Sequence, residues 1–462
     1  MQFEEIKNLI CTKCGSGLTH GNDEIICGGC NSSFPFKNGI GDFRRNDSYW
    51  CNVPREKMRS LIEDAVSLGD WEKASVKHIP DYMEHFTSCK RADFRFLLPF
   101  DKDSVVLDAG AMWGGISIPL AKEVKTLYAV DQTLETIEFL NVRARQSGIG
   151  NIIALASGLD KLPFRDGMFD LIIMSGVLEW VAMEEEAVIS RDYYKPRENY
   201  KTYKLTPSEA QINVLKEIRR VMKSDGVLYL SIENRYALPY FLGVPDEHVN
   251  IKYIPLMPRK IADIIARMKL NSPYRTYTYS GSRLKEILEK SGFQDVRIMG
   301  CHPHYIEPEF ICPSGRCSHY LKKYRKSLGR KYSLLSRILP SGILSQSIPS
   351  LVAISGDGKR IEARNSKIIS MIEKHPEIKI EKPLKEIALV KSRKGDNLPA
   401  FYEIYVEDKE TPAYFCKVAR DPRSALILEE EFRNIKSFRE ATKDSFQNIS
   451  PLLGFINNDD FK

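Results

Sequence analysis

The 462-residue sequence lacks any hydrophobic run close to the ~18 residues that a membrane span requires. Its first residues, MQFEEIKNLI, lack the basic start and apolar stretch of a secretory signal. Internal repeats and low-complexity segments are missing as well. These absences argue against a membrane-spanning, secreted or fibrous protein, and we expect a cytoplasmic location.

The charge balance lacks a strong excess of either sign. The net charge of +7 is the difference between 68 Lys and Arg residues and 61 Asp and Glu residues. Such a mild excess suits an acidic partner but falls short of the charge density of a dedicated nucleic-acid binder. With 43% hydrophobic and 28% charged residues, the composition is that of a globular chain of several domains.

Four of the ten cysteines form two close pairs, Cys11-x2-Cys14 and Cys27-x2-Cys30. A CxxC turn lets two thiolates reach one tetrahedral zinc ion, and neighbouring glycines permit the tight backbone. A disulfide pair or a redox CxxC is the alternative. Because no secretory signal is present, the paired spacing favours a structural zinc site with Cys11, Cys14, Cys27 and Cys30 as ligands.

The residues around these cysteines carry a resemblance. The segment LICTKCGSGLTHGNDEIICGGCNSSFPFKNGIGDF closes on an aromatic residue, a proline and a Gly-Ile pair. It resembles the short zinc-ribbon family that partners methyltransferases of the translation apparatus, over residues 8 to about 45. The resemblance implies that the ribbon is structural, that it packs against an enzyme, and that a methyltransferase follows.

A strand, a glycine turn and a helix follow in SVVLDAG and GGISIPLAKEV. Gly110 and Gly114 allow the backbone to approach a ligand, and the helix N-terminus supplies unpaired amides. About twenty residues on, a second strand ends in Asp131, a position from which a carboxylate accepts ribose hydroxyls. Alone, this pattern also fits a dinucleotide site or a plain tight turn. Met112 stands where a glycine is often found.

Later segments resemble the class I S-adenosylmethionine (SAM)-dependent methyltransferases. They are the LPF turn at 162–164, the strand FDLIIMSG, the stretch VLKEIRRVMKSDGVLYLSIENR, the stretch YSGSRLKEILEKSGFQDVRIMG and the strand SIPSLVAIS. The resemblance implies an α/β fold with a Rossmann-like seven-stranded sheet that binds SAM. The cofactor-binding residues that it implies are Asp108, Gly110, Gly114, Asp131, Asp160, Leu162 and Ser175.

Some of these positions have plainer interpretations. Leu162 and Phe164 fit a buried turn without a ligand, and Asp108 fits a residue that caps the following turn. The acid that often contacts adenine aligns with Gly158, with Asp160 two residues later. A relic that kept the fold without the activity is therefore an alternative to an active enzyme.

Methyl transfer needs in-line positioning of the acceptor, and a base when the acceptor is a hydroxyl. The stretch SIENRYALPYFLGVPDEH supplies Glu233 and His248 as candidate catalytic residues. A lone loop histidine is more often solvated or capping. The same stretch resembles methyltransferases of surface-polysaccharide assembly, so we expect O-methylation of a sugar or another hydroxyl-bearing small molecule. An RNA methyltransferase and a non-enzymatic scaffold are the alternatives.

Two further segments are singled out by their residue types. Three cysteines and three histidines lie between Cys301 and His319, and we expect scattered side chains of a substrate loop rather than a second metal site. Apolar residues recur at helical spacing over residues 321–339 among many basic ones. Such a helix packs on its own domain, or contacts an anionic membrane or a lipid-linked substrate.

The C-terminal segment from IALVKSRKGDN to EEEFRNIKSF resembles the N-terminal lobe of the aminoglycoside-phosphotransferase and protein-kinase group. Lys417 and Glu431 occupy the positions of that family's phosphate-binding lysine and its ion-pair partner. A glycine-rich loop and a catalytic loop are missing, so we expect an incomplete lobe, or one completed by a separate chain. A surface ion pair is the alternative interpretation.

The expected organisation is a zinc ribbon at residues 1–45, a helical linker or cap at 46–100 and a methyltransferase domain at 101–357. A linker at 358–382 and the partial kinase-like lobe at 383–462 complete it. The expected cofactors are SAM and structural zinc, and the expected partner is a small-molecule or glycan acceptor.

Overall fold

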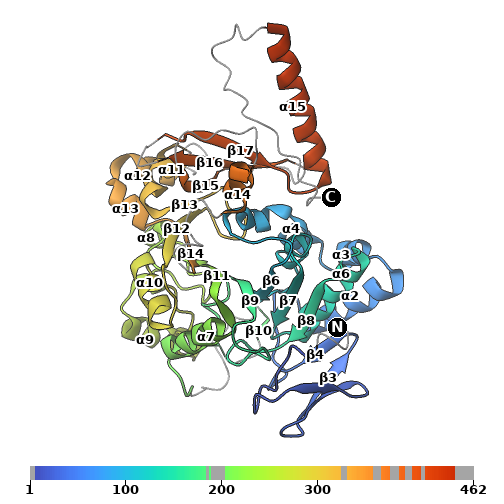
Figure 1. Cartoon of the computed structure of the whole chain (residues 1–462). Helices are drawn as coiled ribbons and strands as arrows, with labels where there is room; N and C mark the ends of the chain where they lie inside the picture. The colour runs from blue at the N-terminus through green and yellow to red at the C-terminus, as the bar shows by residue number, and fades with distance from the viewer. Residues whose placement is uncertain are drawn as a thin grey trace.

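The computed structural model describes residues 6–183, 187–188, 203–323, 330–356, 366–374, 384–390, 398–406 and 411–442. A large sheet crosses the molecule, and helices cover both of its faces (Figure 1). Successive residues of the central strands point to opposite faces: Leu107 and Ile172 join one hydrophobic core, and Val106 and Leu171 join the other. Near-continuous apolar strands are what burial on both faces requires.

Seven strands form the centre of this sheet. Their order is β8-β7-β6-β9-β11-β14-β12, in which β14 runs antiparallel to both of its neighbours. The strands are β6 (Val105–Ala109), β7 (Thr126–Asp131), β8 (Ile152–Ala156), β9 (Phe169–Ser175), β11 (Met222–Glu233), β12 (Arg297–His302) and β14 (Ser350–Ser355). The predicted α/β, Rossmann-like fold is therefore confirmed.

The helices divide between the two faces. One face packs against α7 (Pro207–Val221) and α10 (Gly281–Lys290), and the other against α5 (Ser117–Ala121), α6 (Leu134–Gln146) and α14 (Lys367–Lys374). Helix α7 begins at a capping box, in which the side chains of Thr206 and Glu209 each bond to the other residue's backbone N–H. This local signal fixes where the chain turns after the undescribed residues 189–202.

The N-terminal ribbon extends one edge of the sheet. Its strands are β1 (Leu18–His20), β2 (Glu24–Cys27), β3 (Ser33–Lys37) and β4 (Ile40–Asp42), and β4 pairs parallel with β8. Residues 50–97 follow as a helical cap. Its elements are β5 (Trp50–Cys51), α2 (Arg55–Leu68), α3 (Trp71–His78), the 3-10 helix Pro80–Tyr82, α4 (Met83–Thr87) and the 3-10 helix Cys89–Leu97. The short strand β10 (Ala187–Val188) pairs with β5.

Further strands extend the opposite edge. They are β13 (Phe310–Pro313), β15 (Leu384–Val390), β16 (Ala400–Val406) and β17 (Tyr414–Val418), followed by α15 (Pro422–Thr442). A buried ion pair ties this edge to the helical cap, because the Arg420 guanidinium donates to both carboxylate oxygens of Asp93 at 2.6–2.9 Å. The C-terminal strands thus continue the methyltransferase-type sheet.

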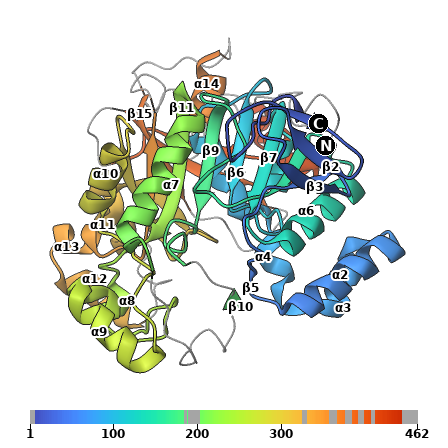
Figure 2. The same ribbon diagram turned by 90° about the horizontal axis from the view of Figure 1, so that it is seen from below.

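Short helices and turns cover one side of the molecule (Figure 2). They are α8 (Leu238–Phe241), the 3-10 helix Ile254–Leu256, α9 (Arg259–Leu270), the 3-10 helix Ser314–Arg316, α11 (Cys317–Lys323), α12 (Arg330–Ile338) and α13 (Ser341–Gln346). The predicted basic helix at 321–339 falls on α11 and α12, and Tyr324, Leu328 and Gly329 lie outside the described residues. In the part of the chain that the structure describes, no helix is both long and apolar enough to cross a membrane.

Candidate functional site

The glycine loop, residues 108–114, joins β6 to α5 at the carboxyl edge of the sheet. The backbone N–H groups of Gly110 and Ala111 both donate to the carbonyl of Val130, at 2.8 and 3.0 Å. Gly110 and Gly114 have φ of +90° and +78°, which glycine adopts without strain. Met112 also lies in the left-handed region, with φ of +47°, at a cost of about 1 kcal/mol.

The Met112 side chain packs with the hydrophobic cluster of the helical cap, which contains Phe86, Trp113 and Phe139. This packing contributes stability that offsets the strained backbone. With Met112, the loop therefore keeps the backbone conformation that glycine would adopt at this position.

Two aspartates, the buried Asp108 and the partly buried Asp131, flank the glycine loop. Asp108 accepts a hydrogen bond from the Ser117 hydroxyl at 2.6 Å, and Asp131 accepts from the backbone N–H groups of Met112 and Thr133, both at 3.0 Å. Burial raises the pKa of each carboxyl to about 6. Asp108 is therefore tied to the first turn of α5 through the Ser117 hydroxyl, whereas Asp131 holds the loop at the end of β7.

The other predicted cofactor residues lie in different surroundings. Leu162 and Phe164 are fully buried in the core, and the backbone N–H of Leu162 donates to Glu217 at 2.7 Å. Asp160 is exposed and forms a 2.8 Å ion pair with Arg45. Ser175, the last residue of β9, shares a 2.7 Å hydrogen bond with Ser231 on β11. Of these residues, Ser175 lies at the same strand edge as Asp108.

The predicted catalytic residues lie together. Glu233 ends β11, and its Oε2 lies 3.5 Å from Nε2 of His248. Both side chains are at most 5% exposed. The other ring nitrogen of His248, Nδ1, lies 3.2 Å from Asp246, which also accepts the backbone N–H groups of His248 and Val249. The turn thus orients the imidazole toward Glu233.

Two further side chains complete this histidine–carboxylate cluster. Nε2 of His304 lies 3.4 Å from Glu233 and 3.5 Å from Glu247. Glu179 lies close to Glu233 and His248, and the Tyr305 hydroxyl donates to it at 3.3 Å. The cluster comprises Glu179, Glu233, Asp246, Glu247, His248 and His304.

The carboxyl groups of the cluster differ in their pKa and therefore in their charge. Burial and the neighbouring Glu233 carboxylate raise the pKa of Glu179 well above its usual range. Burial opposes ionisation of Glu233, but the imidazoles of His248 and His304 hold its pKa well below that range. Burial would lower the pKa of both imidazoles, yet their carboxylate neighbours raise it, to about 9 for His304 and well above normal for His248. Glu233 is thus the carboxylate, and Glu179 holds its proton.

Several buried polar atoms of the cluster have no hydrogen-bond partner among the described residues. They are Oε2 of Glu179, Oε2 of Glu233, Oδ2 of Asp246 and Nε2 of His304. Orphaned buried polar atoms are uncommon in folded proteins and mark places where a ligand or solvent completes the bonding. The cluster is therefore able to bind and polarise a polar group.

The cluster adjoins the glycine loop through the turn after β9. A side chain at Gly110 would collide with Val177, and one at Gly176 would collide with Tyr305. The sequence analysis assigned no role to Glu179 or Tyr305. Glu179 lies in the turn that follows β9, and the turns after the strands of such a sheet form its ligand-binding edge.

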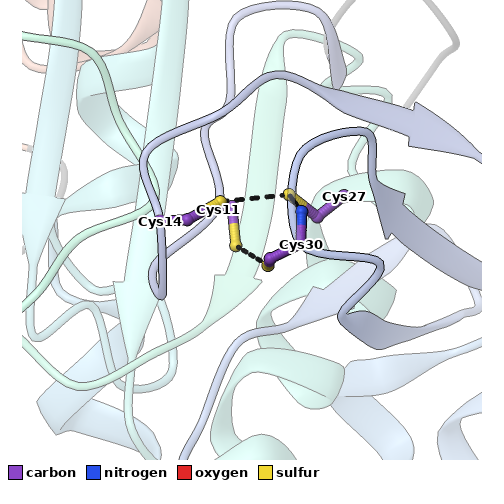
Figure 3. A group of neighbouring side chains, drawn as sticks. All are labelled: Cys11, Cys14, Cys27 and Cys30. Atoms are coloured by element: carbon purple, nitrogen blue, oxygen red, sulfur yellow. Dashed lines mark hydrogen bonds between the residues drawn. The ribbon is translucent and has the colours of Figure 1, made fainter.

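The four ribbon cysteines converge from two turns (Figure 3). Sγ of Cys11 lies 3.7 Å from Sγ of Cys30, and Sγ of Cys14 lies 3.4 Å from Sγ of Cys27. Zn–S bonds of ~2.3 Å in a tetrahedron separate the sulfurs by about 3.8 Å. The backbone N–H groups of Lys13, Gly29 and Cys30 donate to the sulfurs at 3.3–3.4 Å. These residues fit a zinc ion.

The ribbon packs against the LPF turn. The backbone N–H of Ile10 donates to the carbonyl of Pro163 at 3.0 Å, and Leu9 forms a bridge with Phe164. The side chains of Leu9, Cys11 and Cys27 lie in the same core as Leu162 and Phe164. The ribbon therefore shares one hydrophobic core with the LPF turn.

The remaining candidates lie apart from this site. Cys301, Cys312 and Cys317 are buried in β12, β13 and α11 rather than in a substrate loop, and His319 is exposed. No three of these thiols and imidazoles converge as metal ligands within the described ranges. Lys417 and Glu431 form the expected ion pair, with each side chain 38% exposed.

Comparison with known proteins identifies one region by sequence. Residues 100–292 match the sequence model of a family described as "Methyltransferase domain". No curated protein matches the chain.

Solved methyltransferase structures resemble the chain only in part. A phosphoethanolamine N-methyltransferase 2 of Haemonchus contortus with bound SAM has a TM-score of 0.35 and 12% identity, over 64% of this chain and 60% of that enzyme. A SAM-dependent methyltransferase of Aquifex aeolicus has a TM-score of 0.29 and 19% identity, over 52% of this chain and 92% of that protein. A complex of the Haloferax volcanii Trm112 methyltransferase activator and a methyltransferase has a TM-score of 0.32 and 13% identity, over 64% of this chain and 97% of that chain.

The chain thus covers about three fifths of the nematode enzyme. TM-scores this low describe a partial likeness of fold and carry no information on substrate. Over residues 100–292 the chain matches a methyltransferase domain, and the strand order β8-β7-β6-β9-β11-β14-β12 is that of the Rossmann-like sheet described above.

Proposed function

We propose that this chain is a SAM-dependent methyltransferase, and that it methylates a hydroxyl group of a sugar or another small polar acceptor. The observation that carries the proposal is the buried Glu233 carboxylate between two imidazoles. Its Oε2 lies 3.5 Å from Nε2 of His248 but has no hydrogen-bond partner among the described residues. An alcohol must lose its proton as it attacks, so a buried carboxylate at this place has a chemical use.

The glycine loop and its neighbours fit the methyl donor. Asp131 uses its oxygens to accept two backbone N–H groups, and a carboxylate with about four lone pairs still has capacity for ribose hydroxyls. Gly110 and Gly114 let the backbone approach the ligand, and Ser175 offers a hydroxyl at the same edge. When bound, SAM supplies an electrophilic methyl group on a sulfonium.

The chain's own residues then do two things. Glu233 accepts the hydrogen bond of the acceptor hydroxyl on Oε2 and receives the proton as the new C–O bond forms. His248 is a positioning residue: Asp246 holds its Nδ1, and its Nε2 fixes the Glu233 carboxylate. The protonated Glu179 and His304 supply donors that orient the acceptor.

The ribbon has a supporting role in this proposal. Cys11, Cys14, Cys27 and Cys30 would hold zinc, and the filled ribbon would brace the LPF turn that includes Leu162. Asp160 pairs with Arg45 just after the ribbon, so its expected contact with adenine would require that ion pair to open. The kinase-like character of β15–β17 stays a prediction that rests on Lys417 and Glu431.

An RNA acceptor is the second candidate, favoured by the resemblance of residues 8 to about 45 to the zinc-ribbon family that partners methyltransferases of the translation apparatus. The net charge of +7 is compatible with it. RNA affinity would fall steeply with salt, because phosphate contacts release counterions.

The test is a transfer assay with methyl-labelled SAM and fractionated extract of the protein's own cells. Label in glycan, lipid-linked glycan or small polar molecules supports the proposal, and an alkali-stable ether identifies O-methylation. Label confined to RNA would replace it with the second candidate. Glu233→Gln serves as the matched control, since it removes the base and keeps the side-chain shape.

A further inference from the structure

The exposed face of α9 carries apolar side chains at helical spacing. Ile261, Ile264 and Met268 are 48%, 56% and 82% exposed, although they lie at positions i, i+3 and i+7 of one stripe. The opposite face is used for packing, since Ala262 and Ala266 are fully buried against the residues before α9. The exposed stripe therefore takes no part in packing α9 against the rest of the protein.

Further apolar side chains are exposed on the turns between α8 and α9. Phe241, Leu242 and Val244, at the end of α8, are 54%, 37% and 48% exposed, and Tyr253 is 45% exposed. These residues lie close together, because a side chain at Gly243 would collide with the Tyr253 hydroxyl. We call the set Phe241, Leu242, Val244, Tyr253, Ile261, Ile264 and Met268 the α8–α9 face.

Basic residues border the stripe. Lys260 and Arg267 lie on one flank and Lys269 on the other, and all three are exposed. The one acid of α9, Asp263, pairs with Arg267 at 2.7 Å and accepts the backbone N–H of Tyr274. An apolar stripe bordered by lysine and arginine matches the boundary of an anionic bilayer, where acyl chains lie below and phosphates lie above.

The position of the face connects it to the catalytic cluster. The turn at residues 245–252 carries Asp246 and His248 in the cluster, while Val249 and Ile251 of the same turn pack on the buried side of α9. The cluster therefore lies about one helix diameter, ~10 Å, behind the exposed stripe. A polar acceptor held at the headgroup level of a membrane would be within reach.

We infer that the α8–α9 face docks the enzyme on an anionic membrane surface, so that the acceptor is presented by a lipid. The choice of acceptor rests on the proposed function, whereas the docking itself does not. This face lies far from α2 at the opposite side of the molecule (Figure 2). An exposed apolar residue of α2, Val66 (62% exposed), therefore provides a matched control.

The test is co-sedimentation of the full chain with vesicles of phosphatidylcholine alone or with 30% phosphatidylglycerol as the probe. We expect binding to the anionic vesicles that weakens with salt. Ile264→Glu and Met268→Glu should each reduce the partition coefficient at least about tenfold, which corresponds to ~1.4 kcal/mol. Val66→Glu should leave it unchanged.

Three outcomes would overturn the inference. They are no sedimentation with either vesicle, equal sedimentation of Ile264→Glu and the unmodified protein, or concentration-dependent self-association that Met268→Glu abolishes. The last would identify a second copy as the partner. SAM binding and methyl transfer are measured separately from vesicle binding. A protein that binds anionic vesicles but transfers no methyl group to the proposed acceptors would reject the proposed function and leave the docking intact.

Discussion

The glycine loop and the histidine–carboxylate cluster differ in how their buried polar atoms are satisfied. Around the loop, Asp108 and Asp131 accept hydrogen bonds from the chain itself at 2.6–3.0 Å. In the cluster, Glu179 and Glu233 each keep a buried oxygen with no hydrogen-bond partner among the described residues. A loop that is satisfied in advance is preorganised for one constant ligand, whereas an unsatisfied cluster leaves its bonding to the acceptor.

The largest effect should come from breaking the cluster alone. His248→Gln removes the imidazole that fixes Glu233 and keeps a hydrogen-bonding side chain of similar reach. We expect methyl transfer to fall by about 10²-fold, because a displaced Glu233 carboxylate no longer faces the acceptor hydroxyl. SAM affinity, measured by calorimetry, should stay unchanged, because the imidazole of His248 faces Asp246 and Glu233 and not the glycine loop. A parallel loss of SAM affinity would show that the two regions are not separable.

Removing the ribbon metal should instead lower the affinity of the glycine-loop region for SAM. Cys14→Ser with Cys30→Ser loosens the turns that hold Ile10 against Pro163, so the LPF turn loses support. If ordering the loosened LPF turn costs SAM binding about 1.4 kcal/mol, SAM affinity falls by about tenfold. Zinc content measured by mass spectrometry should fall together with SAM affinity. Cys89→Ser, at a partly buried cysteine outside the ribbon, is the cysteine control. Unchanged SAM affinity in the double variant would contradict the supporting role of the ribbon.

Low pH should also lower the affinity of the glycine-loop region for SAM. Burial raises the pKa of Asp131 to about 6, and the nearby Asp108 has the same value. Below that pH the Asp131 carboxyl is protonated and accepts fewer hydrogen bonds, so SAM affinity should fall by up to about tenfold between pH 7 and pH 5. Asp131→Asn should bind SAM more weakly and lose this pH dependence. A slope that survives in Asp131→Asn would assign the titration to another group.

The smallest effect should follow Met112→Gly. Glycine removes the left-handed strain of about 1 kcal/mol and also removes the packing of the side chain in the helical cap. These changes oppose each other, so SAM affinity should shift by less than about threefold. Met112→Ala keeps the strain and loses the packing, and it should therefore unfold more easily than Met112→Gly by about 1 kcal/mol. Denaturant titration measures the difference, and the reverse order would contradict the account of Met112.

The sequence predicted those parts of the fold that depend on local pattern. Apolar strands that end in Asp108 and Asp131, and the late strand that became β14, could be recognised because burial on both faces requires near-continuous apolar runs. The pairing of β13 with β15 could not be recognised, because an edge strand joins a sheet through backbone atoms that any sequence offers.

The candidate site was predicted unevenly for a similar reason. Glu233 and His248 were both named, but their contact depends on a turn fixed by Asp246, which the spacing of residues does not reveal. His304 and Tyr305 reach the same cluster from β12, some seventy residues later. Such contacts are set by sheet order, which a single sequence specifies only through the whole fold.

The most direct measurement is a crossed comparison of two variants, Asp131→Ala and Glu233→Gln, in SAM binding and in single-turnover methyl transfer. The account predicts that Asp131→Ala loses SAM affinity, and that Glu233→Gln binds SAM normally but transfers the methyl group at least about a hundredfold more slowly. Thermal unfolding of both variants checks that each is folded. Equal transfer by Glu233→Gln and the unmodified enzyme, with both saturated by SAM, would contradict the central claim that Glu233 receives the acceptor's proton.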